Sequence, residues 1–251
     1  MAEAGRLEEF QCPLFDADDC AALVERLFDL EGFWIERHPS LPFHTLGATN
    51  YYDITANPAR PYERLARQYN PFLLNNFGGI YAALTAALAR RLEAPVQFHE
   101  GAALPGFHIF GADPVFTPSP QHDITHAQWF ERRDGNAFPG NPIHVDTAHR
   151  PLGLQEPTLS CTLSLRLPST GAGLKVWPLL EEHGRGLTQP QLMDLLNRTP
   201  ARYAPYTVGT LFVHSGDWYH QARGLPYLPG EYRITLQGHG VRMDGRWHLF
   251  W

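Results

Sequence analysis

The sequence predicts a mainly β fold, a sandwich or barrel with helices packed on one outer face. From about residue 97 onward, short apolar and β-branched segments alternate with Gly and Pro turns, as in such folds. The stretch 158–167 alternates strictly between apolar and polar residues, which is typical of a strand with one apolar face. The two longest segments with helical periodicity both lie upstream, in residues 1–96.

Three helices are expected. Asp16 can cap a first helix, whose apolar residues then follow helical spacing. A second helix is expected over residues 76–92, with its apolar residues on one face. A third and shorter helix is expected over residues 189–197, because Thr188 and Gln191 form the pattern of a capping box.

Short strands account for most of the rest. Between residues 33 and 52, aromatic and β-branched residues broken by prolines suggest short strands. Further strands are expected at residues 97–99, 106–110, 158–167, 174–177, 210–215, 219–222 and 233–238. If the apolar side of 158–167 packs on the helices, its polar side faces the interior of the barrel.

One domain over residues 1–251 is the economical interpretation, because no internal repeat and no low-complexity linker divides the chain. Residues 1–96 then form a mixed helical support, and residues 97–251 form the β core. The segment 112–140 is long, rich in Pro, His and Asp, and without clear periodicity. A segment of this kind can serve as a lid over a site.

Composition narrows the class of protein. A net charge of −6 argues against nucleic acid as a primary partner, since phosphate binding needs clustered basic residues. The three cysteines are odd in number and show no metal-binding spacing, which fits a reducing compartment. The first ten residues lack the apolar core of a signal peptide, and the longest apolar run, Ile80 to Ala89, is too short to span a bilayer. We therefore expect a cytoplasmic protein with no membrane partner.

Two pairs of residues carry the candidate chemistry. His144 and Asp146 form a His-x-Asp pair, and on an extended strand residues two apart point to the same side, so both could bind one metal ion. Arg233 and Thr235 share one side of a later strand in the same way, and an arginine beside a hydroxyl is a receptor for a carboxylate. Either pair alone is a common pattern.

The order of these pairs, with His220 between them, resembles the iron(II)- and 2-oxoglutarate-dependent oxygenases. Two further stretches support the resemblance: GTLFVHS over residues 209–215, ahead of His220, and TLSCTLSLRLPSTGAGLKVWP over residues 158–178. The match covers residues 106–241, about half of the chain. The resemblance implies a double-stranded β-helix, that is, a jelly-roll or cupin-like core, with the N-terminal helices packed on one face.

The resemblance also implies roles for five residues. His144, Asp146 and His220 correspond to the ligands of Fe(II), Arg233 to the residue that binds the distal carboxylate of 2-oxoglutarate, and Thr235 to a residue assisting it. Three protein ligands leave positions open for 2-oxoglutarate and O2. Members of the family that transfer halide lack the carboxylate ligand, so Asp146 favours hydroxylation, desaturation or another oxidation of a small molecule. An amino acid, a peptide-borne side chain or a natural-product intermediate would each fit as the substrate.

Other histidines could compete as metal ligands. His214 lies close before His220, but Arg223 follows it too soon to pair with it as Arg233 does with His220. His149 could reach a metal only through a turn. The i, i+4 pair His122 and His126 could bind a metal only on a helix, and the residues before it do not predict one.

Four residues are candidates for the substrate pocket, although each also has a purely structural interpretation. His108 lies on an expected core strand and is either near the iron or a buried, hydrogen-bonded histidine. Trp129 and Trp218 could line a cavity, although aromatic residues more often pack in cores. Arg150 could receive an acidic substrate or be a surface arginine. An alternative for the whole protein is a cupin-like metal-binding isomerase or ligand-binding sensor without oxygenase activity.

Overall fold

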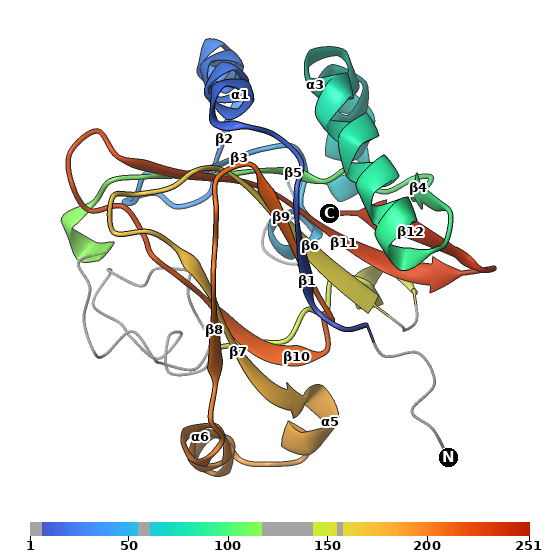
Figure 1. Cartoon of the computed structure of the whole chain (residues 1–251), viewed down its shortest axis with the longest axis vertical. Coiled ribbons are helices and arrows are strands. Elements are labelled where there is room, and N and C mark those ends of the chain that lie inside the picture. Colours follow the sequence, from blue (N-terminus) through green and yellow to red (C-terminus); the bar gives the residue numbers. More distant parts are fainter. Residues whose placement is uncertain (1–6, 55–60, 117–142, 155–157) are drawn as a thin grey trace.

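The computed structural model of this chain describes residues 7–54, 61–116, 143–154 and 158–251 (Figure 1). Most of the predicted lid over 112–140, together with Trp129, His122 and His126, lies outside the described residues. Within the described parts the predicted mainly β fold with flanking helices is confirmed.

The main sheet contains nine strands. Along its central path they are ordered β1-β9-β6-β11-β5-β3-β2, while β12 pairs with both β11 and β4. Every pair is antiparallel except β12 with β4. The strands are β1 (Phe10–Pro13), β2 (Ile35–Glu36), β3 (Phe43–Leu46), β4 (Val96–Phe98), β5 (Gly106–Gly111), β6 (Thr158–Arg166), β9 (Thr210–His214), β11 (Tyr232–Met243) and β12 (Arg246–Phe250).

A second, smaller sheet has the order β10-β7-β8 and is antiparallel throughout. Its strands are β7 (Gly173–Leu180), β8 (Arg202–Pro205) and β10 (Trp218–Arg223). An isolated antiparallel bridge between His144 and His220 adds the segment around His144 to its edge. Figure 1 shows this sheet on the side of the main sheet opposite to the two long helices, so that two sheets enclose an interior.

The helices are α1 (Ala17–Asp29), α2 (Asn50–Asp53), α3 (Tyr62–Leu92), α5 (Glu181–Gly184) and α6 (Gln189–Arg198), with short 3-10 turns η1 (Glu31–Phe33), η2 (Pro114–Phe116) and η4 (Arg150–Leu152). The predicted cap of the first helix is confirmed, because the Asp16 side chain accepts a hydrogen bond from the Asp19 amide at 2.8 Å. The predicted capping box is present before α6, where the Thr188 amide donates to Gln191 Oε1 at 2.8 Å.

The second helix is longer than predicted. It begins at Tyr62 rather than near residue 76, with Pro71 inside it and a break in helical geometry at Phe77. The first half is rich in polar residues around Pro71, which conceals its apolar face in the sequence, yet Tyr62, Ala66 and Leu73 are buried. By length and composition alone α3 could cross a membrane, but a core helix passes the same test, and α3 contributes buried residues to the core. The absence of a membrane partner therefore stays a prediction.

The main core lies between α1, α3 and the outer face of the main sheet. On β6 the apolar residues Leu159, Cys161, Leu163 and Leu165 belong to it together with residues of both helices. The polar residues Ser160, Thr162 and Ser164 take the opposite face of β6, as predicted from the alternation, and are also buried. The main sheet therefore has an apolar outer face against the helices and a polar inner face toward the second sheet.

Candidate metal centre

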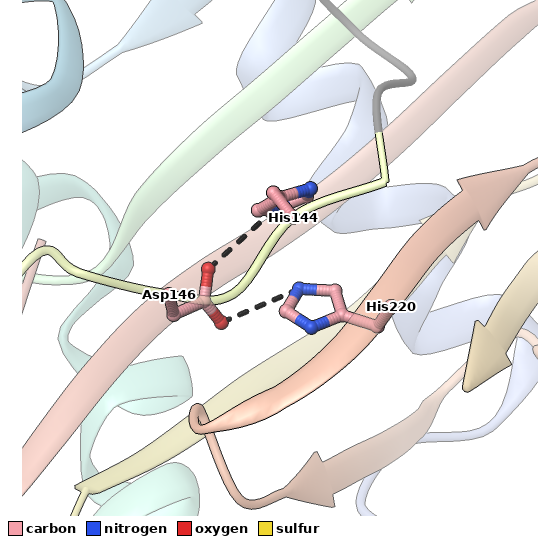
Figure 2. Close-up of side chains that lie close together, drawn as sticks. All are labelled: His144, Asp146 and His220. Atoms are coloured by element: carbon pink, nitrogen blue, oxygen red, sulfur yellow. Dashed lines mark ion pairs between the residues drawn. The ribbon is translucent and has the colours of Figure 1, made fainter. Parts of the chain in front are cut away.

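His144, Asp146 and His220 come together at one end of the interior, as the sequence predicted (Figure 2). His144 Nε2 lies 3.6 Å from Asp146 Oδ1, and His220 Nε2 lies 3.5 Å from Asp146 Oδ2. One ligand atom from each residue lies within 4.8 Å of the other two, a spacing that suits a single metal ion. Two imidazoles and one carboxylate on one side of an ion leave its other side open.

The backbone fixes this arrangement. His144 and His220 exchange two backbone hydrogen bonds, at 3.0 and 2.8 Å, so their side chains leave neighbouring strands next to each other. Two residues later, the Asp146 amide donates to the Gly216 carbonyl at 2.8 Å, which holds the chain against the turn before β10. The His-x-Asp spacing therefore places both side chains toward His220.

The described hydrogen bonds also prepare His220 as a ligand. Its Nδ1 lies 2.7 Å from the Trp218 carbonyl oxygen, which can only accept, so this nitrogen carries the proton and Nε2 keeps its lone pair. Burial lowers the pKa of His220 to about 4, against an opposing effect of Asp146. A neutral imidazole with a free Nε2 is the form that binds metals.

Asp146 is held in its charged form. Burial raises the pKa of its carboxyl group, but the imidazoles of His220, His239 and His144 lower it by more, so the pKa lies well below its usual range. The carboxylate is almost fully buried, whereas about a third of the His144 side chain is exposed. The centre is therefore closed behind Asp146 and more open beside His144.

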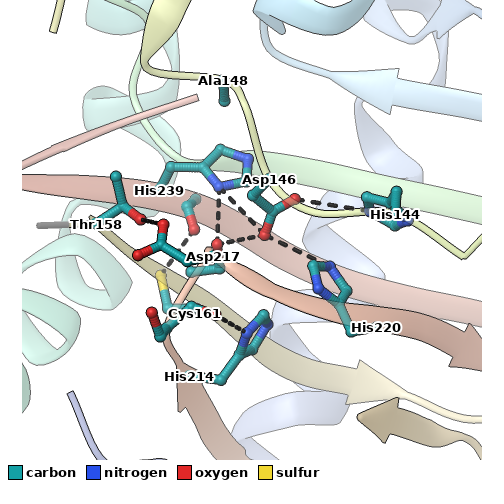
Figure 3. A network of polar contacts seen from close by, with 12 residues as sticks. His144, Asp146, Ala148, Thr158, Cys161, His214, Asp217, His220 and His239 are labelled. Atoms are coloured by element: carbon teal, nitrogen blue, oxygen red, sulfur yellow. Dashed lines mark hydrogen bonds and ion pairs between the residues drawn. The ribbon is translucent and has the colours of Figure 1, made fainter. Parts of the chain in front are cut away.

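Three further residues, Tyr51, Ser160 and His239, contact Asp146, and Figure 3 shows His239 beside it. The Tyr51 hydroxyl donates to Asp146 Oδ1 at 2.9 Å, and the Ser160 hydroxyl donates to Oδ2. His239 Nδ1 lies 3.1 Å from Ser160 Oγ and 3.8 Å from Asp146 Oδ2. Strand parity does put Ser160 on the inner face and His239 on the side of β11 that carries Arg233, but nothing in the sequence around Tyr51 indicates the contact.

Arg233 and Thr235 share the inner face of β11, as predicted. Arg233 is 2% exposed, and its guanidinium donates to the Gly224 carbonyl at 3.1 Å and lies 4.4 Å above the Phe110 ring. Its Nε has no hydrogen-bond partner, and no carboxylate of the described residues forms an ion pair with it. Burial lowers the pKa of Arg233 to about 10, so the group stays charged at neutral pH.

A buried cation without a counter-charge is costly unless an anion binds it. Thr235 lies opposite Ser164 on β6 and opposite His108 on β5. Ser164 Oγ and His108 Nε2 are also buried without a hydrogen-bond partner. This part of the inner face therefore fits a ligand that carries a carboxylate, and the residues present suit the acid cosubstrate that the sequence resemblance implies.

The remaining candidates are placed less directly. His108 lies on the inner face of β5, and burial lowers its pKa to about 3, so it is neutral. Trp218 begins β10 and contributes its carbonyl to His220. Arg150 forms an ion pair with Glu181, and its side chain is 46% exposed, which matches its alternative interpretation as a surface arginine.

The alternative metal ligands His214 and His149 are not part of the His144, Asp146 and His220 group. The His214 ring lies 4.7 Å from the His220 ring, but His214 is not among the described residues whose ligand atoms converge. His149 is buried and lines the same narrow depression as Asp146, Ser160 and His239. His214 and His149 thus surround the centre without completing it.

Comparisons with solved structures support this architecture. An N-substituted L-amino acid dioxygenase from Burkholderia ambifaria superposes with a TM-score of 0.56 at 14% identity, over 97% of this chain and 86% of that chain. Its structure in complex with α-ketoglutarate gives a TM-score of 0.54 at 13% identity, over 97% and 86%. SnoK, a non-haem α-ketoglutarate-dependent carbocyclase from nogalamycin biosynthesis, gives 0.52 at 11% identity, over 97% and 92%.

No protein-family model matches the chain, and no curated protein does. At 11–14% identity, the likeness to solved structures concerns the fold. It confirms the predicted jelly-roll core, here with two sheets that do not close into a barrel.

Proposed function

We propose that this protein is a non-haem iron(II)- and 2-oxoglutarate-dependent dioxygenase that acts on a small molecule as a single domain. One observation carries the proposal. The interior of a jelly roll holds both a converging His144, Asp146 and His220 group and a buried Arg233 with which no carboxylate of the described residues forms an ion pair. A metal site and a carboxylate receptor on facing sheets are what this chemistry requires.

In this assignment His144, Asp146 and His220 hold Fe(II), and Arg233 binds the distal carboxylate of 2-oxoglutarate with help from Thr235. When bound, Fe(II), 2-oxoglutarate and O2 supply an oxidant that can take a hydrogen atom from an unactivated carbon, with release of succinate and CO2. The chain binds and orients these groups and shields them from water.

Different residues serve metal binding, cosubstrate binding and substrate access. His220 keeps Nε2 unprotonated through its bond to the Trp218 carbonyl, and Asp146 stays ionised among the imidazoles. The buried guanidinium of Arg233 offers a fork that matches a carboxylate and is better desolvated than a surface arginine. The partly exposed side of His144 is where a substrate can approach.

Hydroxylation, desaturation or a related oxidation is preferred over halogenation, because Asp146 supplies the carboxylate ligand that halide-transferring members of the family lack. For the substrate we favour an amino acid derivative or a natural-product intermediate. The folds of an N-substituted amino acid dioxygenase and of an enzyme from nogalamycin biosynthesis support this range. A cytoplasmic location remains a prediction.

Turnover is the test of this proposal. Purified protein with Fe(II), ascorbate and 2-oxoglutarate is incubated with a panel of N-substituted amino acids and natural-product intermediates, and succinate is measured against a substrate-free blank. We expect succinate above the blank for at least one compound, together with a product that has gained 16 Da or lost 2 Da. A cupin-like isomerase or sensor would form neither succinate nor an oxidised product. Its isomerase activity or ligand binding would not change when Arg233 is replaced.

A further inference from the structure

Both oxygens of Asp146 already accept a hydroxyl hydrogen bond. Tyr51 donates to Oδ1 at 2.9 Å and Ser160 donates to Oδ2. The two hydroxyls come from unrelated places, α2 in the N-terminal part and β6 in the main sheet. An aspartate can rotate about its side-chain bonds, so two donors on different oxygens fix the plane of the carboxylate.

The two donors are linked to each other through His239. Ser160 Oγ lies 3.1 Å from His239 Nδ1, and the His239 ring meets the Tyr51 ring edge to face at a centroid distance of 5.5 Å. Because Ser160 gives its own hydrogen to Asp146, His239 Nδ1 is the donor to Ser160 Oγ. Tyr51, Ser160 and His239 are therefore joined to Asp146 and to each other by a continuous set of contacts. This set includes neither His144 nor His220.

Tyr51 is itself held in place from both sides. Before it, the Asn50 side chain donates to the Ala148 carbonyl, two residues beyond Asp146. After it, Asp53 is fully buried and accepts two hydrogen bonds from Arg37, at 2.7 and 3.0 Å, and one from the Thr49 amide at 2.8 Å. The position of the Tyr51 hydroxyl is thus set by a buried ion pair of the N-terminal segment.

We propose that Tyr51 and Ser160 are positioning residues of the metal centre, whose hydroxyls orient Asp146 so that its remaining lone pairs face the metal. This inference rests on the proposed metal site. It gives Tyr51, together with the Arg37–Asp53 ion pair that holds it, a part in metal binding that goes beyond support of the β core. Groups that orient a metal ligand commonly change metal affinity by about 10-fold to 100-fold when removed.

The test uses Co(II) as the probe, because its visible spectrum reports the geometry of its ligands. The full-length variants Tyr51→Phe and Ser160→Ala each lose one hydroxyl, and Tyr52→Phe is the matched control, since its ring packs over Arg37 rather than reaching Asp146. We expect Tyr51→Phe and Ser160→Ala to bind Co(II) about 10-fold to 100-fold more weakly with an altered spectrum. Tyr52→Phe should match the wild type, and Ser160→Thr, which keeps the hydroxyl, should recover most of the affinity.

The outcomes separate this inference from the proposed function. If the wild-type protein does not bind Co(II), or Asp146→Ala binds it equally well, the proposed metal site fails. If the wild type binds and both hydroxyl variants keep its affinity and spectrum, the site stands and the positioning role is overturned. A purely structural role would lower the melting temperature of the metal-free variant without changing the Co(II) spectrum. If Tyr51→Phe does not fold, the comparison of Ser160→Ala with Ser160→Thr decides.

Discussion

The two faces of the main sheet are buried alike but built differently. On β6, Leu163 and Ser164 are neighbours, and both are 0% exposed. Leu163 points to α1 and α3 within the main apolar core, whereas Ser164 points inward and its hydroxyl has no hydrogen-bond partner among the described residues. Burial alone therefore does not identify the site. What distinguishes the inner face is that it buries polar groups whose hydrogen bonds are unmet, as a ligand site does.

The same contrast holds on β11. Ile234 and Leu236 belong to the apolar core, while Arg233 and Thr235 alternate with them and lie on the inner face. This contrast predicts that substitutions on the inner face change ligand affinity more than the free energy of unfolding. Substitutions on the outer face should change the free energy of unfolding more than ligand affinity.

The largest effect is expected from Asp146→Ala. The change removes the carboxylate at the centre of the metal group and leaves four imidazoles nearby without it, so Fe(II) binding and oxidation should both be abolished. The metal content of the purified variant and its succinate production measure this, with circular dichroism as the check on folding. A folded variant that retains full activity would show that Asp146 is not a ligand.

Arg233→Met should have the next largest effect. Loss of one partner of a buried charge pair costs about 2–5 kcal/mol of binding free energy, which weakens 2-oxoglutarate binding by roughly 30-fold to several thousand-fold. Calorimetric titration of the metal-loaded protein measures the change. Arg242→Met is the matched control, because Arg242 lies on the same strand but is exposed. Equal affinities in the two variants would contradict a carboxylate receptor at Arg233.

Leu163→Ala tests the outer face. Removing a fully buried leucine side chain should lower the free energy of unfolding by about 2–5 kcal/mol, through lost burial and the cavity left behind. Urea denaturation of the metal-free protein measures it. Under conditions where the variant is folded, its affinity for 2-oxoglutarate should equal that of the wild type, and a large loss of affinity would mean that the two faces are not separate in function.

The smallest effect is expected from Ser164→Ala, one residue further along. Because the hydroxyl has no hydrogen-bond partner in the part of the chain that the structure describes, its removal should leave the free energy of unfolding within about 1 kcal/mol of the wild type, or raise it slightly. The affinity for 2-oxoglutarate should fall by less than about tenfold, the size of one neutral hydrogen bond. A destabilisation as large as that of Leu163→Ala would show that Ser164 has a structural partner.

Local sequence patterns predicted the faces of the strands, the metal group and a helix cap. Strand parity placed Ser160, Thr162 and Ser164 on the inner face, and the order of His144, Asp146 and His220 predicted a group that does converge. These features depend on residues close in sequence, or on a motif whose spacing reflects the fold. The N-terminal cap at Asp16 was predictable for the same reason.

What the sequence did not reveal depends on contacts between distant segments. Tyr51 reaches Asp146 only because Arg37 pairs with Asp53, and no periodicity marks that turn. The first half of α3 was missed because Pro71 and its polar neighbours hide a face that is buried only after packing. The strands β1, β8 and β12 are short and are stabilised by their partners rather than by their own composition.

In the proposed function, a metal site and a carboxylate receptor inside the jelly roll bind one ligand together. Calorimetric titration of 2-oxoglutarate into the Fe(II)-loaded protein without oxygen, and into the metal-free protein, tests it most directly. We predict tight, stoichiometric binding to the loaded protein, much weaker binding without metal, and loss of binding in Arg233→Met. Absence of binding to the loaded protein, or binding that depends on neither the metal nor Arg233, would contradict the account.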